Sequence, residues 1–159
     1  MDHKSGAVLR PMTIRQMTIE DYPEVFALWE SIEGFAIRSI DDSYDGVKRF
    51  LARNPGLSVV AELDGKLVGT ILCGSDGRTG YFYHVCVERS YRNKGIGSDM
   101  VRFCTEALKA DGVNKISLIA FKQNRLGNSF WQSTGWSPRE DVNVYDLVLN
   151  DENKIKRNL

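Results

Sequence analysis

The apolar side chains follow two periods along the chain, and each period predicts a different kind of element. Short stretches rich in β-branched residues predict strands, and two of them are joined by Asp64-Gly65, a strong hairpin turn. We expect strands at residues 13–17, 57–63, 66–73, 81–87, 115–121 and 142–149. Apolar residues at helical spacing predict helices. These are expected from the capping residue Thr18 through Trp29 and at residues 45–54, 98–110 and 126–133.

The order of these elements defines the fold class. A strand and two helices come first, three hairpin-linked strands follow, and the chain closes with helix, strand, helix and strand. Such an order is typical of a mixed α/β domain in which an antiparallel meander precedes a β-α-β crossover. Residues 31–43 are expected to form a loop, and residues 151–159 a polar, frayed tail.

Length and composition indicate one ordinary globular domain. The 159 residues are 42% hydrophobic and 26% charged with no net charge, so the balance favours neither a nucleic acid nor an anionic membrane as partner. No apolar run reaches the ~20 residues of a membrane helix, and the first residues lack the apolar core of a signal peptide. We expect a single domain over residues 12–150, preceded at residues 1–11 by an N-terminal extension or a cloning remnant.

The cysteines indicate a reducing compartment. Cys73, Cys86 and Cys104 are odd in number and lie on two expected strands and one expected helix. Buried, reduced thiols in a cytoplasmic protein explain this pattern best. With two histidines and no Cys-x-x-Cys motif, we expect no metal site.

Residues 85–98 carry the strongest chemical signal. An apolar strand runs into a basic turn that contains Gly95 and Gly97, and an amphipathic helix follows. A helix start offers unpaired N–H groups and about half a positive charge, and glycine lets an anion approach the backbone closely, so this turn predicts a phosphate site. The turn is not a P-loop, because no Gly-Lys-Ser/Thr ending exists. It is not a dinucleotide fingerprint either, because Met100 stands where the third glycine is needed.

Two segments together resemble the GNAT acetyltransferase superfamily. The first is Arg92-Asn93-Lys94-Gly95-Ile96-Gly97, an Arg-x-x-Gly-x-Gly pattern between a strand and a helix. The second runs from Asn124 through Phe130-Trp131 to Gly135-Trp136 and resembles the family's Asn…Phe-Tyr-x-x-x-Gly-Phe. The resemblance covers about residues 13–149. Within the superfamily, the sequence looks most like small bacterial enzymes of the ribosomal-protein-alanine acetyltransferase type.

The resemblance implies a GNAT fold, with a central, mostly antiparallel sheet of six to seven strands, a β-α-β crossover and helices on both faces. It implies an N-acetyltransferase that moves an acetyl group from acetyl-CoA to a primary amine by direct attack. The amine would belong to a small molecule, a protein N-terminus or a lysine, and homodimers are common in the family. The coenzyme-binding residues that the resemblance implies are Val85, Cys86, Val87, Arg92, Asn93, Lys94, Gly95, Ile96, Gly97, Ser98 and Asn124.

Acetyl transfer requires that the attacking amine lose a proton, because a protonated amine has no lone pair. Tyr81 and Tyr83 stand at the positions where, by the resemblance, a base that takes this proton is often found. A phenol with a pKa of ~10 is a poor base, so these tyrosines are expected to position the amine or to pass a proton through water. Regular alternation puts both tyrosines, Val85 and Val87 on one face of the strand and His84 on the other, where a satisfied core histidine is expected.

Trp131 leaves the function open to alternatives. It stands where many members of the family have a tyrosine whose hydroxyl protonates the departing sulfur, and indole has no usable acidity. A coenzyme A thiolate can leave unprotonated, so catalysis is not forbidden. Three hypotheses therefore remain: an acetyltransferase, a non-catalytic acyl-CoA-binding or regulatory module, and a general nucleotide or phosphate binder. Covalent transfer through Cys86 is a further alternative, and the acidic loop of residues 31–43 is expected to select the acceptor.

Overall fold

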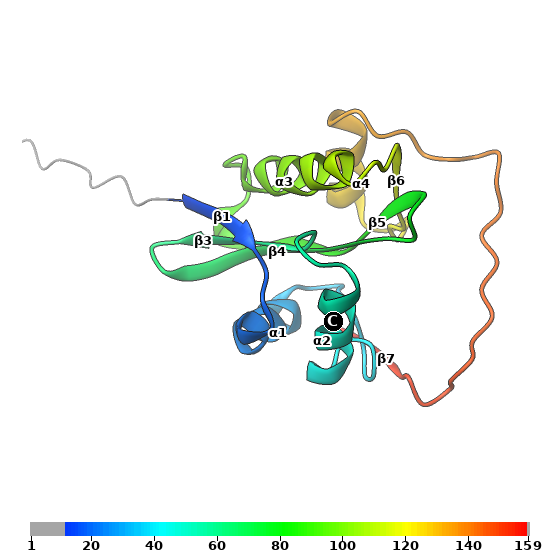
Figure 1. Cartoon of the computed structure of the whole chain (residues 1–159), viewed down its shortest axis with the longest axis horizontal. Coiled ribbons are helices and arrows are strands. Elements are labelled where there is room, and N and C mark those ends of the chain that lie inside the picture. Colours follow the sequence, from blue (N-terminus) through cyan, green and yellow to red (C-terminus); the bar gives the residue numbers. More distant parts are fainter. Residues whose placement is uncertain (1–11, 159) are drawn as a thin grey trace, which may run out of the picture.

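The computed structural model describes residues 12–158, so the expected extension at residues 1–11 lies outside the described part (Figure 1). Its centre is a five-stranded sheet in the order β1-β3-β4-β5-β6. Neighbouring strands are antiparallel except β5 and β6, which are parallel because a helix crosses over between them. The strands are Met12–Gln16 (β1), Val59–Leu63 (β3), Lys66–Ser75 (β4), Thr79–Val87 (β5) and Lys115–Leu118 (β6).

Helices cover both faces of this sheet (Figure 1). One face packs against α1 and α2 around the fully buried Trp29, and the other packs against α3 and α4 around Met100. Burial of each large side chain stabilises the fold by about 1.5–3 kcal/mol. None of the helices in residues 12–158 is long and apolar enough to cross a membrane. The helices are Tyr22–Ser31 (α1), Tyr44–Arg53 (α2), Ile96–Ala110 (α3) and Arg125–Ser133 (α4), with 3-10 turns at Ile19–Asp21 and Arg89–Tyr91.

The helix boundaries follow local chemistry. Ser43 caps α2 by accepting a hydrogen bond from the Gly46 N–H at 3.1 Å. Asn54-Pro55 ends the same helix, since a proline restricts the residue before it to extended conformations. Gly112, with a φ of 80°, follows α3 in the left-handed conformation that commonly ends helices. The predicted mixed α/β class, the crossover and the helices on both faces are confirmed.

The C-terminal part differs from the expectation. Residues 142–149 form no strand, so the central sheet has five strands rather than six to seven. The tail that was expected to fray contains β7 (Ile155–Arg157), which pairs antiparallel with β2 (Ala36–Arg38) inside the expected loop. Asn158 Nδ2 reinforces this pair by donating to the carbonyls of Trp29 and Ile32, both at 2.9 Å. Two three-residue strands so far apart in sequence have no local pattern that predicts them.

β5 contains a bulge at His84. Its register against β4 pairs Tyr83 with Leu72 and Cys86 with Thr70, so two residues of β5 stand opposite one residue of β4. His84 has a φ of 51°, in the left-handed region that non-glycine residues rarely adopt. The Thr70 hydroxyl donates to the His84 carbonyl at 3.0 Å and thereby holds the bulged backbone in place.

The bulge changes which side chains share a face of β5. Tyr83 packs edge-on against Phe50 of α2, with 5.9 Å between ring centroids, and His84 lies 4.6 Å from Trp29 of α1. Val85 instead packs with the cluster under α3. The expectation that Tyr83 and Val85 share one face while His84 takes the other is therefore wrong. A bulged residue uses up one step of the two-residue period and reverses every side chain after it.

Candidate functional site

A gap opens between the parallel strands β5 and β6. Their pairing ends at Phe82 and Leu118, while β5 continues to Val87 and stays paired with β4 on its other side. The backbone of β5 beyond Phe82 therefore carries N–H and C=O groups that β6 does not satisfy. A chain-like ligand with amide groups can pair with such an edge as an added strand does.

The backbone groups of Val85 and Val87 point into this gap. The Glu88 N–H donates to the Val68 carbonyl of β4 at 2.8 Å, and successive residues of a strand alternate in the side to which they bond. Val85 and Val87 therefore bond away from β4, as their predicted role requires. Cys86, predicted to bind the coenzyme alongside them, turns its backbone toward β4 instead, and its side chain is buried under α1 and α2.

The basic turn leads directly into α3. Gly95 is the N-cap with a φ of 81°, and Asn93 also lies in the left-handed region with a φ of 63°. The first α-helical hydrogen bond joins the Asp99 N–H to the Gly95 carbonyl at 3.0 Å. The N–H groups of residues 96–98 therefore have no acceptor within the helix. Together with the helix dipole they form a site for an anion.

The anion site adjoins the end of the gap. A Cβ placed on Gly97 would lie 3.4 Å from Phe130 of α4 and 4.0 Å from Val87 of β5. Arg92 Nε donates to the Val87 carbonyl at 3.0 Å, which brings its guanidinium to the same corner, and Lys94 is exposed beside it. Donors for a diphosphate and a free strand edge for an amide-bearing arm are thus contiguous.

Asn124 caps α4 from the loop beyond β6. Its Oδ1 accepts a hydrogen bond from the Gly127 N–H at 3.0 Å, and its Nδ2 is the group that can donate to a ligand. Asn128, which the sequence analysis did not single out, donates from Nδ2 to the carbonyls of Phe121 and Asn124 at 2.9 and 2.8 Å. These bonds fix the loop that borders the gap on the β6 side.

Tyr81 and Tyr83 of β5 are partly exposed to solvent, by 36% and 50%. Partial burial raises the pKa of Tyr83, and the charges of Tyr81 and Asp41 raise it further. Its hydroxyl therefore stays protonated at neutral pH and acts as a hydrogen-bond donor rather than as a base. Tyr83 is suited to hold an acceptor or an ordered water, not to remove a proton by itself.

His84 is held by a buried carboxylate whose role the sequence did not reveal. His84 Nε2 lies 2.7 Å from Asp42 Oδ1, and Asp42 Oδ2 accepts from the Arg38 N–H at 2.7 Å. The Tyr22 hydroxyl donates to the Asp42 carbonyl at 2.8 Å. His84 is a satisfied, largely buried histidine as expected. Asp42, expected among the acidic residues that meet the acceptor, is 4% exposed and serves this pair instead.

Hydrogen bonds join the acidic loop of residues 31–43, called the acceptor loop below, to the C-terminal segment. Asn153 Oδ1 accepts from the Ile40 N–H at 2.9 Å, and Asn153 Nδ2 donates to Asp41 Oδ2 at 2.9 Å. The Arg157 guanidinium of β7 lies 4.2 Å from the ring centroid of Phe121, just after β6. β7 therefore joins the acceptor loop to the β6 side of the gap, a contact for which the sequence offered no signal.

Two residues considered for chemistry are buried in the core. Burial raises the pKa of the Cys86 thiol to about 11, and its Sγ lies 3.3 Å from the Thr70 hydroxyl. A protonated, enclosed thiol is not a nucleophile. Trp131 is 9% exposed, with its ring 4.9 Å from that of Trp136 and 6.2 Å from that of Phe82. Trp131 therefore packs in the core.

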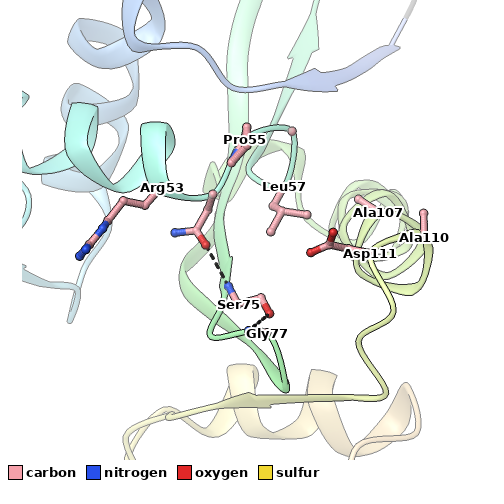
Figure 2. Close-up of a pocket in the computed structure, with 10 residues that line it drawn as sticks. Arg53, Pro55, Leu57, Ser75, Gly77, Ala107, Ala110 and Asp111 are labelled. Atoms are coloured by element: carbon pink, nitrogen blue, oxygen red, sulfur yellow. Dashed lines mark hydrogen bonds between the residues drawn. The ribbon is translucent and has the colours of Figure 1, made fainter.

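A separate pocket of about 390 Å³ lies at the opposite end of the sheet (Figure 2). It is bordered by the C-terminal ends of α2 and α3 and by the turn between β4 and β5 (Figure 2). Two backbone N–H groups at this pocket bond within the protein: the Ser75 N–H donates to Asn54 Oδ1 at 3.0 Å, and the Gly77 N–H donates to the Ser75 hydroxyl at 2.9 Å. It has neither a helix start nor a free strand edge, and within residues 12–158 no cluster of three or more metal-ligating side chains occurs.

Comparison with known proteins gives these features a context. The sequence model of the acetyltransferase (GNAT) family matches residues 14–136. Acetyltransferase SG1711 of Sodalis glossinidius (strain morsitans) is 31% identical over 131 residues, which cover 82% of this chain and 91% of that protein.

Solved structures show the same fold. The aminoglycoside N-acetyltransferase AAC(6')-Iy in complex with CoA superposes with a TM-score of 0.68 at 18% identity, covering 87% of this chain and 95% of that chain. A ribosomal-protein-alanine N-acetyltransferase from Brucella melitensis biovar Abortus 2308 superposes with a TM-score of 0.64 at 20% identity, covering 86% and 99%.

Proposed function

Because the chain belongs to the acetyltransferase (GNAT) family, we propose that it transfers an acetyl group from acetyl-CoA to a primary amine by direct attack. The observation that carries the proposal is the contiguity of two features. The free N–H groups at the start of α3 suit a diphosphate, and the unpaired backbone of β5 suits the amide-bearing arm of the coenzyme. A simple phosphate binder needs only the first of these features.

The coenzyme is held along one continuous path in this proposal. Its diphosphate lies on the N–H groups of residues 96–98, with the side chains of Arg92 and Lys94 beside it. Its arm pairs with the backbone of Val85 and Val87, and Asn124 Nδ2 reaches it from the loop beyond β6. We leave Cys86 out of this set because its backbone bonds toward β4.

The chemistry follows from this placement. The amine nitrogen attacks the thioester carbonyl carbon, a carbon–nitrogen bond forms, the carbon–sulfur bond breaks, and the electron pair leaves on the sulfur as a thiolate. A β5 N–H that faces the gap donates to the carbonyl oxygen as negative charge develops on it. The amine loses its proton to a water molecule. The partly exposed Tyr83 hydroxyl, with Tyr81 beside it, holds this water in place.

Proximity supplies much of the acceleration. Holding amine and thioester in reactive geometry is worth as much as ~7–11 kcal/mol in the best cases, so no strong base is required. The leaving thiolate also needs no acid, since a thiol pKa is ~8.5. Burial of Trp131 in the core is therefore compatible with turnover.

The acceptor is proposed only as an amine cation. Asp41 is exposed on the acceptor loop close enough to Tyr83 to affect its pKa, so a positive charge is favoured there. Structurally similar proteins include an aminoglycoside acetyltransferase and a ribosomal-protein-alanine acetyltransferase, and both acceptor types carry such an amine. The three free, buried cysteines support a cytoplasmic location. A homodimer is also part of the proposal.

Release of coenzyme A thiol in the presence of a panel of amines tests this function. The panel contains aminoglycosides, polyamines and peptides with alanine at the N-terminus. We expect acetyl-CoA to bind more tightly than ATP, and at least one amine to release thiol without a burst. Tight acetyl-CoA binding with no thiol release from any amine would favour the non-catalytic acyl-CoA-binding module. Equal competition by ATP would favour a general phosphate binder.

A further inference from the structure

The bulge in β5 decides which way the Val85 N–H points. Continued without a bulge, the register of β5 before His84 would bring Val85 opposite Thr70 and turn its N–H toward β4. With His84 as the extra residue, Cys86 takes the place opposite Thr70 instead. The Val85 N–H then turns away from β4 and into the gap, where β6 offers it no acceptor. The bulge therefore creates the donor that the proposed function needs at the thioester oxygen.

The Thr70 hydroxyl fixes the peptide unit that carries this donor. The His84 carbonyl and the Val85 N–H belong to one planar, trans peptide, so they point in opposite directions. Thr70 Oγ1 donates to that carbonyl at 3.0 Å and accepts from Trp29 Nε1 at 3.1 Å. Thr70 is fully buried, so solvent does not compete for these bonds. Because the carbonyl is held toward β4, the N–H at the other side of the peptide is directed into the gap.

The side chain of His84 is anchored to the acceptor loop. Its ring contacts the rings of Trp29 and Phe35, with centroids 4.6 and 4.7 Å away, and its Nε2 lies 2.7 Å from Asp42 Oδ1. Asp42 is itself fixed, because its Oδ2 accepts from the Arg38 N–H at 2.7 Å. A left-handed backbone is unfavourable for a residue with a Cβ, so His84 needs such contacts to remain in it.

We propose that Asp42, His84 and Thr70 are positioning residues for acetyl transfer. Together they hold the bulge that aims the Val85 N–H at the thioester oxygen, and each acts through that N–H rather than by contact with the reacting atoms. The inference rests on the proposed function, because it requires the thioester to lie in the gap. Asp42 follows Asp41 on the acceptor loop, so the loop that meets the amine also holds the donor that activates the thioester.

Infrared difference spectroscopy of bound acetyl-CoA, isotope-labelled at the thioester carbonyl, measures this donor directly. A hydrogen bond from a preorganised N–H polarises the carbonyl and lowers its stretching frequency. Thr70→Val keeps the shape of the side chain and removes the hydroxyl, so we expect its carbonyl band at a higher frequency than in the wild type. Thr70→Ser is the matched control, since it keeps the hydroxyl and should keep the wild-type band.

A second pair of variants tests the anchor on the acceptor loop and does not depend on how well Thr70→Val folds. His84→Phe keeps the ring contacts and removes the bond to Asp42, so the band should move as it does in Thr70→Val. His84→Gln loses the ring, but its side-chain amide can donate to Asp42 Oδ1, and the band should stay at the wild-type frequency. Circular dichroism and urea unfolding check that each variant is folded.

Steady-state kinetics separate positioning from a general structural role. With an amine that the wild type acetylates, Thr70→Val and His84→Phe should lower kcat about 10- to 100-fold while the KM for acetyl-CoA changes less than about threefold, because an oxyanion donor stabilises the transition state rather than the bound coenzyme. A merely structural defect would instead weaken coenzyme binding together with kcat, and that result would contradict positioning.

Two spectroscopic results would also overturn the proposal. One is an unchanged band in Thr70→Val and His84→Phe when both are folded and bind acetyl-CoA. The other is an equal band shift in Thr70→Ser and His84→Gln, since lost packing rather than lost hydrogen bonds would then explain it. The infrared comparison needs no amine and no turnover. An unchanged band with normal transfer therefore contradicts only the positioning, whereas the expected band shifts with no transfer to any amine contradict only the proposed function.

Discussion

A carboxylate at Gly97 should weaken coenzyme binding about 100-fold without harming the fold. Gly97 is the second residue of α3, and its N–H is one of the three donors assigned to the diphosphate. A Cβ at this position lies 3.4 Å from Phe130, an ordinary contact, and the φ of Gly97 is not left-handed. Gly97→Glu therefore adds a negative charge at the anion site and leaves the surrounding packing in place.

The expected loss of affinity is large. A hydrogen bond to a charged group contributes about 1.5–3 kcal/mol, and a side chain at Gly97 obstructs at least one of them. Two unit charges about 8 Å apart at an effective dielectric constant of about 40 add roughly 1 kcal/mol of repulsion. A total near 3 kcal/mol corresponds to a loss of about 100-fold in affinity. In contrast, replacing a helical glycine removes a penalty of about 1 kcal/mol, and Glu in a first turn adds about 0.3–1 kcal/mol of stability.

Isothermal titration with acetyl-CoA and urea unfolding measure the two effects separately. Gly97→Gln is the matched control, since it has the same size without the charge, and it should lose only about tenfold in affinity. The difference between the Glu and Gln variants should shrink as salt rises, because screening weakens charge repulsion. Unchanged acetyl-CoA affinity in Gly97→Glu, with a folded protein, would refute the assignment of this turn to the diphosphate.

Three further variants test the rest of the site. Tyr83→Phe keeps the ring contact with Phe50 and should lower kcat about five- to tenfold at unchanged acetyl-CoA affinity in steady-state kinetics; an equal kcat would remove Tyr83 from the mechanism. Asp42→Ala leaves His84 Nε2 and the Arg38 N–H without their partner and should lower the free energy of unfolding, measured in urea, by about 2–4 kcal/mol. A change below about 0.5 kcal/mol would show that the Asp42–His84 pair does not hold the loop. Cys86→Ala should keep kcat within about threefold in the thiol-release assay, since burial holds the thiol pKa at about 11, and a 100-fold loss would instead support covalent transfer.

Local patterns were sufficient for most of the fold. The expected helix over residues 45–54 is observed at Tyr44–Arg53, and the expected strand over residues 66–73 extends to Ser75. These elements depend on caps, turns and periodicity, which are written into neighbouring residues. The parting of β5 and β6, in contrast, depends on where their pairing ends, at Phe82 and Leu118, and no local pattern indicates that point.

Two departures have physical causes that no local pattern reveals. The bulge at His84 needs no glycine, because the Thr70 hydroxyl and Asp42, both distant in sequence, hold the bulged residue. The pairing of β2 with β7 depends on Asn153 and Asn158, whose bonds to α1 and the acceptor loop span more than half of the chain. Asp41 of the acidic loop lies close enough to Tyr83 to raise its pKa, whereas Asp42 is buried against His84, and only these contacts distinguish the two carboxylates.

The departure at residues 142–149 is of a third kind. Their side chains still fit a buried strand, and the described chain places no strand beside them.

A crystal structure with acetyl-CoA tests the central claim most directly. The account predicts that the diphosphate oxygens accept hydrogen bonds from the N–H groups of residues 96–98 and that the coenzyme's arm bonds to the backbone of Val85 and Val87, with the thioester in the gap between β5 and β6. A coenzyme bound elsewhere, or an empty turn at saturating acetyl-CoA, would contradict it.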